Sequence, residues 1–310
     1  MVYEVVGDAR TLRRETEAEN LPGNVGIVHS RSKSGGGREW AHPFVDCKEQ
    51  IAYVANGAAG FFEGKRDFGA VGKKLVAQGH TFRSNAAERI GKYPLLPDGS
   101  CVHGSEMMCH LIESLTADGG DPVRAMRQAY QALPSEIAGL AIHAAVPDCV
   151  IASRINQPLM LARTGDSTCI ATTAFAFNEK DCEWLSTLPC NATAAVYGDR
   201  VELFPFDNPP ARVADVLPWP AGADKVLECI AQAEGVGLGA LKTATTPLWP
   251  KDLVPQHYMM VYELLRSMHA AGTVEFRNTM VDGVRPGTKV PATRMYLTGK
   301  TLRARKGEHE

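Results

Sequence analysis

The order of the predicted secondary structure is the feature that most constrains how this chain folds. Apolar, β-branched runs predict three early strands, at 2–6, 25–29 and 51–55. Helical spacing follows at 67–78, 105–115 and 122–132. Short apolar runs separated by Pro, Asp, Asn and Gly then predict strands at 137–145, 149–154, 159–163, 168–172 and 197–204. Strands followed by helices and then by strands indicate an α+β fold of stacked layers, because a parallel sheet would need alternating strands and helices.

A Pro-rich stretch at 205–220 indicates a domain boundary. Beyond it, helices are expected near 223–234, 237–246 and 256–271, and strands at 273–277 and 293–297. Three helices followed by a β-hairpin resemble a winged helix. We therefore expect a first domain at 1–207, a linker at 208–220 and a small winged-helix-like module at 221–310.

Composition and charge narrow the class of protein. The 310 residues are 45% hydrophobic and 22% charged, with a formal net charge of −2. These values are ordinary for a globular chain and supply no global attraction to nucleic acid or membrane. No apolar run approaches the roughly 18–20 residues of a membrane span. We therefore expect a cytoplasmic protein with no membrane partner.

The 8 cysteines are scattered along the chain and form no C-x-x-C pair. Because ligand pairs of that kind are typical of zinc sites, no metal site is expected from the spacing, and no cofactor is expected either. Most of the cysteines lie among apolar residues, so they are expected to be buried free thiols.

Three short segments carry the strongest functional signal: Gly26–Arg31, Ala41–Pro43 and Tyr53–Gly57. In this order and at this spacing they resemble the glutaminase domain of class II glutamine amidotransferases. Within that class they are most similar to the amidotransferase half of glutamine–fructose-6-phosphate aminotransferases. The resemblance covers about residues 2–204. It implies an N-terminal-nucleophile-hydrolase-like αββα sandwich, here incomplete at its N-terminus.

The resemblance also implies a site. The family hydrolyses the side-chain amide of glutamine through an acyl-enzyme on an N-terminal cysteine. Asn56 and Gly57 match its V-H-N-G motif, whose donors form the oxyanion hole, although an Asn-Gly pair taken alone is typical of a hairpin turn. Arg31 matches the arginine that binds the glutamine α-carboxylate. Ser105 matches the substrate-binding run S-x-T-D-[ST]-E-x-x-x-H.

The sequence departs from the family at several of these positions. After Arg31, the Trp, Thr and His of the family motif are replaced by Ser32, Ser34 and Gly35. Gly104 stands where the family has the Asp that binds the α-amino group of glutamine. The chain begins Met-Val-Tyr, so the family's N-terminal cysteine is absent from it.

Other polar residues of these motifs receive structural interpretations. We expect His42 to be a loop histidine bonded to backbone, and His29 to belong to the core or to a cap. Glu106 is expected to be a charge favoured by the N-terminus of its helix. Cys47 is not expected to act as the nucleophile, because an internal cysteine offers no α-amino group and Asp46 disfavours its thiolate.

Two functional hypotheses follow. The first is a glutamine amidotransferase type 2-like enzyme, active if a cysteine precedes this sequence, with glutamine as substrate and the ammonia acceptor handled by a partner. The second is a catalytically inactive amidotransferase-like binding or regulatory protein with a winged-helix-like tail. Either one favours a protein partner or a second copy of the chain.

DNA is a weaker candidate partner. The helix expected at 256–271 carries one Arg, Arg266, with Glu263 beside it, so direct DNA readout has no support. Basic residues gather instead in the hairpin and tail, where a solvated C-terminus is the favoured interpretation: Arg285, Lys289, Arg294, Lys300, Arg303, Arg305 and Lys306.

Overall fold

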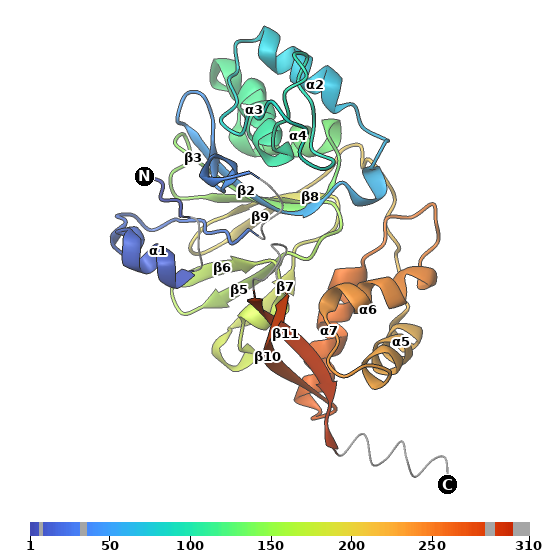
Figure 1. The fold of residues 1–310 in the computed structure, drawn as a ribbon. Coiled ribbons are helices and arrows are strands. Elements are labelled where there is room, and N and C mark those ends of the chain that lie inside the picture. The colour runs from blue at the N-terminus through green and yellow to red at the C-terminus, as the bar shows by residue number, and fades with distance from the viewer. Residues whose placement is uncertain (6–8, 32–35, 283–288, 300–310) are drawn as a thin grey trace. The chain divides into compact units, whose positions relative to one another are not determined.

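A computed structural model describes residues 1–5, 9–31, 36–282 and 289–299 of the chain (Figure 1). The chain divides into two compact units. The first comprises 1–170 and 183–210, and the second comprises 171–182 and 211–310. The predicted α+β class is confirmed, because the helices and the antiparallel strands occupy separate layers rather than alternating.

The first unit contains two sheets. Six antiparallel strands follow one another in the larger sheet: β1 (Phe44–Val45), β2 (Ile51–Ala58), β3 (Glu136–His143), β4 (Val150–Arg154), β8 (Ala192–Val196) and β9 (Val201–Pro205). The smaller sheet has the order β6 (Ser167–Ala171), β5 (Met160–Thr164) and β7 (Trp184–Thr187). Hairpin connections between neighbouring strands produce most of this order, as expected for antiparallel sheets.

Three helices lie on one face of the larger sheet: α2 (Phe68–Ala77), α3 (Gly104–Thr116) and α4 (Pro122–Ala132) (Figure 1). Two of these helices begin with residues that favour a helix start. The side chains of Asp67 and Asp121 cap α2 and α4, and Pro122 is the first residue of α4. Tyr53 of β2 and Tyr130 of α4 join their hydroxyl groups at 2.9 Å, so the helix layer and the sheet are also linked by a buried hydrogen bond.

The opposite face of the larger sheet packs against the smaller sheet. Ala152 and Ala194 of the larger sheet share an apolar core with Leu161 of β5. The first unit is therefore a helix–sheet–sheet stack. The second helix layer of the expected αββα sandwich is not built from the described residues of this unit, since its remaining helix, α1 (Ala9–Glu15), buries no side chain.

Several predicted strands differ from the structure. Residues 2–5 and 25–29 form no strand, and 6 lies outside the described residues. β propensity becomes a strand only where a neighbouring strand supplies a hydrogen-bonding ladder, and these segments are not in a ladder. The strand predicted at 197–204 is the turn and second arm of the hairpin β8–β9, closed by the Tyr197 N–H donating to the Arg200 carbonyl at 2.9 Å.

The second unit consists of helices followed by a hairpin. The helices are α5 (Trp219–Ala231), α6 (Leu238–Thr245) and α7 (His257–Ala270), and the hairpin pairs β10 (Val274–Asp282) with β11 (Lys289–Leu297). Val226, Leu241, Leu265 and Met295 form its core with residues from each of these elements. α5 begins at Trp219, inside the expected linker, because Pro220 suits the first turn of a helix. The winged-helix character of this module stays a prediction.

Candidate functional site

A cavity of about 290 Å³ opens in the first unit beside the C-terminal end of β2. Its wall combines Gly57–Gly60 of β2 and the following turn, His103–Ser105 at the start of α3, and Lys92–Pro94 from the connecting segment. Gly57 and Ser105 belong to different sequence motifs and now border one space. The fold therefore brings two of the four predicted site residues together.

The Asn56-Gly57 pair lies within a strand. Asn56 pairs with Ala138 and Gly57 with Ile137 in the β2–β3 ladder, so the hairpin-turn alternative is wrong. Gly57 has φ +129°, and a Cβ added to it would lie 2.1 Å from the Glu136 carbonyl oxygen. Only glycine suits this backbone, which leaves the cavity open at that point.

Asn56 itself is exposed and does not line the cavity. Side chains alternate between the faces of a strand, and Tyr53 points to the helix layer through its bond with Tyr130. Asn56, three residues on, therefore points to the other face of the sheet. The two predicted oxyanion donors are adjacent in the chain, but of the two, Gly57 borders the cavity and Asn56 does not.

Arg31 does not line the cavity itself but contacts a residue that does. Its guanidinium nitrogen Nη2 donates to the Tyr93 hydroxyl at 3.3 Å, and Tyr93 is part of the cavity wall. The replaced family positions that follow it, Ser32, Ser34 and Gly35, lie outside the described residues.

An arginine that no sequence motif predicts, Arg66, lines the cavity. Arg66 donates to the Pro134 carbonyl at 3.1 Å and to the Ser135 hydroxyl. Burial lowers the pKa of Arg66 to about 10, so it stays cationic at neutral pH. No motif marks this residue, because its position follows from the packing of the α2 entry loop against the segment before β3.

A cluster of aromatic rings packs around His103, the residue that caps the start of α3. His42 packs against His29 with ring centroids 4.2 Å apart and against His103 at 5.1 Å. Burial, followed by the charges of neighbouring groups, lowers the pKa of His42 to about 2 and that of His103 to about 3. Neither ring nitrogen of His42 has a hydrogen-bond partner in the described part of the chain, so the predicted bond to backbone is wrong.

Imidazoles with pKa values this low are neutral at physiological pH and are very weak bases. His103 has one further role, because its Nδ1 accepts the Ser105 N–H at 3.1 Å and so caps α3. His29, which is half-buried against His42, belongs to the same cluster, and the expectation of a core position agrees with that packing.

Glu106 is in the first turn of α3, as predicted, but its partners come from a separate loop. Its carboxylate is buried and accepts the Arg83 N–H at 2.6 Å, the Ser84 N–H at 2.8 Å and the Ser84 hydroxyl. The Ser84 hydroxyl oxygen in turn accepts the His103 N–H at 2.8 Å. Glu106 thus anchors the 83–84 loop to the helix start that borders the cavity.

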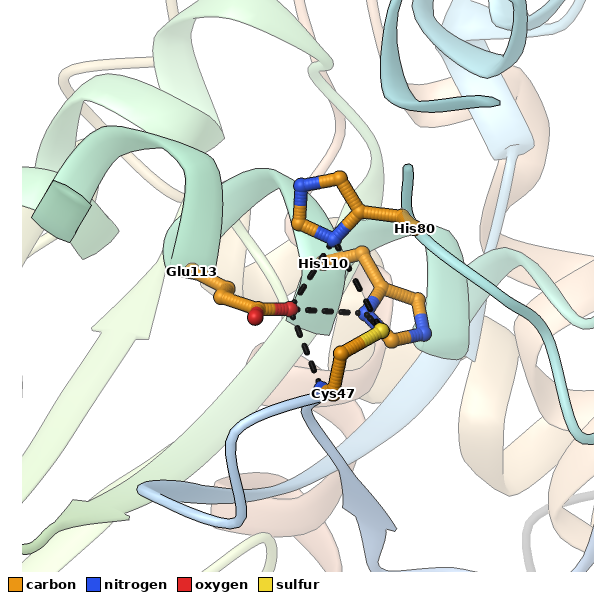
Figure 2. Close-up of side chains that lie close together, drawn as sticks. All are labelled: Cys47, His80, His110 and Glu113. Carbon is orange, nitrogen blue, oxygen red and sulfur yellow. Dashed lines mark hydrogen bonds and ion pairs between the residues drawn. The ribbon is translucent and has the colours of Figure 1, made fainter. Parts of the chain in front are cut away.

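A different set of side chains has the composition of a metal site. The donor atoms of Cys47, His80, His110 and Glu113 all lie within 4.8 Å of one another (Figure 2). The absence of paired cysteines predicts no such site, so the cluster differs from that expectation. Spacing rules detect ligands that are close in the chain, whereas three separate segments supply these four.

Comparisons with known proteins agree with the predicted resemblance. No family model matches the chain. The chain is 31% identical over 176 residues to the glutamine–fructose-6-phosphate aminotransferase [isomerizing] of Halobacterium salinarum, a match that covers 56% of this chain and 24% of that protein. The enzyme of the same name from Thermotoga maritima is 31% identical over 138 residues, covering 44% of this chain and 19% of that protein.

A longer match reaches the enzyme of the same name from Tropheryma whipplei strain Twist, 25% identical over 224 residues, with 70% of this chain and 32% of that protein covered. The matched region spans between about a fifth and a third of these relatives. Their names confirm the predicted similarity to glutamine amidotransferases.

Two solved structures also match. One is an allosteric regulatory enzyme of purine biosynthesis, with a TM-score of 0.45 and 15% identity over 67% of this chain and 44% of that one. The other is the glutamine phosphoribosylpyrophosphate amidotransferase of B. subtilis, with a TM-score of 0.44 and 13% identity over 87% of this chain and 54% of that one. Within the described residues, none of the helices has the length and apolar character needed to cross a bilayer.

Proposed function

We propose that this chain is a class II glutamine amidotransferase-like protein that binds glutamine in the cavity between β2 and α3. The observation that carries the proposal is the meeting of separate motifs. Gly57 and Ser105 border the same cavity, and Arg31 contacts Tyr93 in its wall. These motifs come from three separate segments of the chain, and the fold brings them to one cavity and its wall.

In this proposal each residue has a distinct task. Arg31 binds the α-carboxylate of glutamine, since a guanidinium forks onto a carboxylate with two hydrogen bonds. Ser105 contributes a hydroxyl at the helix start. The Gly57 N–H, which borders the cavity, stabilises the oxyanion that forms on the side-chain amide, whereas the Asn56 side chain faces away from the cavity and takes no part.

Hydrolysis would require a nucleophile. The resemblance assigns it to an N-terminal cysteine, whose thiolate attacks the amide carbon, forms an acyl-enzyme and releases ammonia. Intact mass and N-terminal sequencing of the protein isolated from its own source test for this cysteine directly. A longer species that begins with Cys supports the enzyme; a species that begins at Met1 or Val2 contradicts it.

The second candidate function is an inactive binding or regulatory protein, and Gly104 favours it. The family's Asp at this position binds the α-amino group of glutamine, and Gly104 offers no charge to replace it.

In the second unit, Arg266 of α7 is held by Glu263 at 2.7 Å and also by Glu179, so that cation is already neutralised. We therefore favour a protein partner over DNA for this module. Of the basic cluster expected in the hairpin and tail, Arg285, Lys300, Arg303, Arg305 and Lys306 lie outside the described residues.

Calorimetric titration with L-glutamine tests the binding site. We expect Arg31→Ala to weaken binding at least about tenfold, because a hydrogen bond to a charged group contributes roughly 1.5–3 kcal/mol. Arg124→Ala, which removes an exposed guanidinium from α4, is the matched control and should bind normally. Equal affinities in the two variants would contradict the assignment of Arg31.

Measuring ammonia release on the same samples separates the two functions. Binding with turnover supports the amidotransferase, and binding without turnover supports the regulatory protein. The failure of the wild-type protein to bind glutamine would overturn both forms of the glutamine proposal.

A further inference from the structure

We propose that Cys47, His80, His110 and Glu113 bind a zinc ion. The four side chains point toward one another from three segments of the first unit (Figure 2). Cys47 lies in the turn between β1 and β2, His80 follows α2, and the other two belong to α3. The site is separate from the glutamine cavity, whose lining includes none of these four residues.

The distances fit a tetrahedral ion. Cys47 Sγ is 3.9 Å from His80 Nδ1 and 3.8 Å from His110 Nδ1. Glu113 Oε2 is 2.9 Å from His80 Nδ1 and 3.1 Å from His110 Nδ1. Zinc bond lengths of about 2.0–2.3 Å at tetrahedral angles separate sulfur and nitrogen by roughly 3.6 Å, and nitrogen and oxygen by roughly 3.3 Å. These four separations differ from the tetrahedral values by a few tenths of an ångström, and the whole donor set lies within 4.8 Å.

Two of the ligands lie on a helix, and a third lies in a turn closed by hydrogen bonds. His110 and Glu113 are three residues apart on α3, so they share one face of the helix, and both are buried. The turn that carries Cys47 is closed by the Asp46 carboxylate, which accepts the Gln50 and Ile51 N–H groups at 2.7 Å each. Side chains mounted in this way lose little freedom when a metal binds.

The surroundings suit a metal-bound thiolate and imidazole. The Thr81 N–H donates to Cys47 Sγ at 3.4 Å, which stabilises negative charge on the sulfur. His110 Nε2, the ring nitrogen that faces away from the cluster, is 3.9 Å from Glu106 Oε1. Metal-bound histidines commonly turn their second nitrogen toward a carboxylate. Glu106, whose carboxylate accepts the Arg83 and Ser84 N–H groups, thus lies next to the cluster.

The donor set favours zinc among the divalent ions. Magnesium and calcium prefer oxygen ligands alone, whereas one thiolate, two imidazoles and one carboxylate suit a borderline-soft tetrahedral ion. Four protein donors complete the coordination shell, so the ion has a structural task. It joins the β1–β2 turn and the segment after α2 to α3, the helix whose first residues border the glutamine cavity.

A Cys–His nucleophile pair accounts for the geometry less well. Both Nδ1 atoms lie closer to Glu113 Oε2 than to the Cys47 sulfur. Without a metal, the ring protons at Nδ1 therefore bond to the carboxylate, and neither nitrogen is directed to accept a proton from the thiol.

Metal titration of the full chain tests the proposal. The protein is stripped with a chelator and titrated with Zn²⁺ against a chromophoric competitor, and then with Co²⁺ as a spectroscopic probe. We expect one ion per chain, the visible absorption of tetrahedral cobalt, and a near-ultraviolet sulfur-to-cobalt charge-transfer band. Zn²⁺ should also raise the melting temperature of the stripped protein.

Two variants at the less buried ligands complete the experiment. Cys47→Ser should abolish the charge-transfer band, and both Cys47→Ser and His80→Gln should weaken Zn²⁺ binding by more than about tenfold. Cys182→Ser, which removes a thiol that contacts the Asn178 carbonyl instead, is the matched control and should behave as wild type. Circular dichroism of each metal-free variant confirms folding.

Other results would overturn the proposal. If the wild-type protein binds no stoichiometric zinc, the cluster is a hydrogen-bonded group without a metal. If the charge-transfer band persists in Cys47→Ser, the ion binds elsewhere. A zinc-dependent melting temperature that is unchanged in both variants would likewise exclude this site.

Discussion

Gly57 and Gly104 border the same cavity but tolerate side chains very differently. A Cβ at Gly57 would lie 2.1 Å from a backbone oxygen, and its φ of +129° strains any other residue. The nearest atoms to a Cβ at Gly104 would belong to Phe68 and Pro94, at 3.7–3.9 Å, which is ordinary contact. The first glycine is required by the backbone. The second is a replaceable position at which the family's Asp is absent.

Gly104→Asp should therefore strengthen glutamine binding. The new carboxylate would pair with the substrate ammonium, and the helix N-terminus also favours a negative charge there. A single charge-assisted bond of roughly 1.5–3 kcal/mol predicts a gain of about tenfold or more in calorimetric affinity. Gly104→Asn is the control of equal shape without the charge, and an equal gain in both variants would contradict the electrostatic explanation.

Gly57→Ala should destabilise the first unit strongly. The clash with the Glu136 carbonyl adds to the backbone strain, so we expect a loss of about 3 kcal/mol or more in the free energy of unfolding. Gly99→Ala provides the matched control, because Gly99 also has a positive φ, +86°, but no atom lies within 4 Å of an added Cβ. It should cost only about 1–2 kcal/mol. Urea unfolding measures both, and similar losses would show that the close approach has no effect.

The start of α3 shows how an element is positioned by bonds to another segment. Glu106 supplies a buried acceptor for the loop at Arg83 and Ser84, and Ser84 bonds back to the His103 N–H. Helix propensity accounts for the existence of α3, whereas this network determines where its first turn lies. The same turn carries Ser105 to the cavity.

Glu106→Ala should therefore release the 83–84 loop. The Arg83 and Ser84 N–H groups lose their acceptor, and a buried unsatisfied group costs about 1–3 kcal/mol each. We expect a loss of about 3 kcal/mol in urea unfolding and faster amide exchange at these two residues. Asp98→Ala removes a carboxylate that accepts two hydrogen bonds from Ser100 in an exposed turn, and it should have a smaller effect. Unchanged exchange at Arg83 and Ser84 would contradict the anchoring role.

At the scale of the whole molecule, each unit has its own apolar core and contains at least one histidine kept neutral by burial. Burial lowers the pKa values of His42 and His103 in the first unit, and it lowers that of His257 in the second unit to about 4. The unfolded chain takes up protons at these histidines below about pH 6.5, while the folded chain does not. Stability is therefore independent of these groups above that pH and falls as the pH decreases.

The first unit should consequently lose stability between about pH 6.5 and pH 5, by up to about 1.4 kcal/mol per pH unit for each of His42 and His103. His42→Phe should remove the contribution of one histidine from this slope, up to about 1.4 kcal/mol per pH unit. Trp40 is buried and its ring packs against that of His103, with centroids 5.7 Å apart. Trp40→Phe changes this ring without removing a titratable group, so it should lower stability and leave the slope unchanged. Urea unfolding at several pH values, monitored by hydrogen exchange in peptides of the first unit, measures how the free energy of unfolding changes with pH. An unaltered slope in His42→Phe would refute the interpretation.

The sequence alone determined the features that depend on neighbouring residues in the chain. The helices α2, α3, α4 and α7 lie within a residue or two of their predicted ranges, because apolar periodicity and end residues such as Asp67 and Pro122 are local signals. The resemblance to glutamine amidotransferases also came from short motifs. The strand expected at 25–29 is absent, since a strand needs a partner that local sequence does not reveal.

Tertiary structure decided everything that depends on distant segments meeting. It placed Asn56 on the face of β2 away from the cavity and brought Arg66 to the cavity wall. It also assembled Cys47, His80, His110 and Glu113, which no spacing rule connects. The physical reason is the same in each case: periodicity and capping act within a few residues, whereas a site is made by packing that brings separate elements within bonding distance.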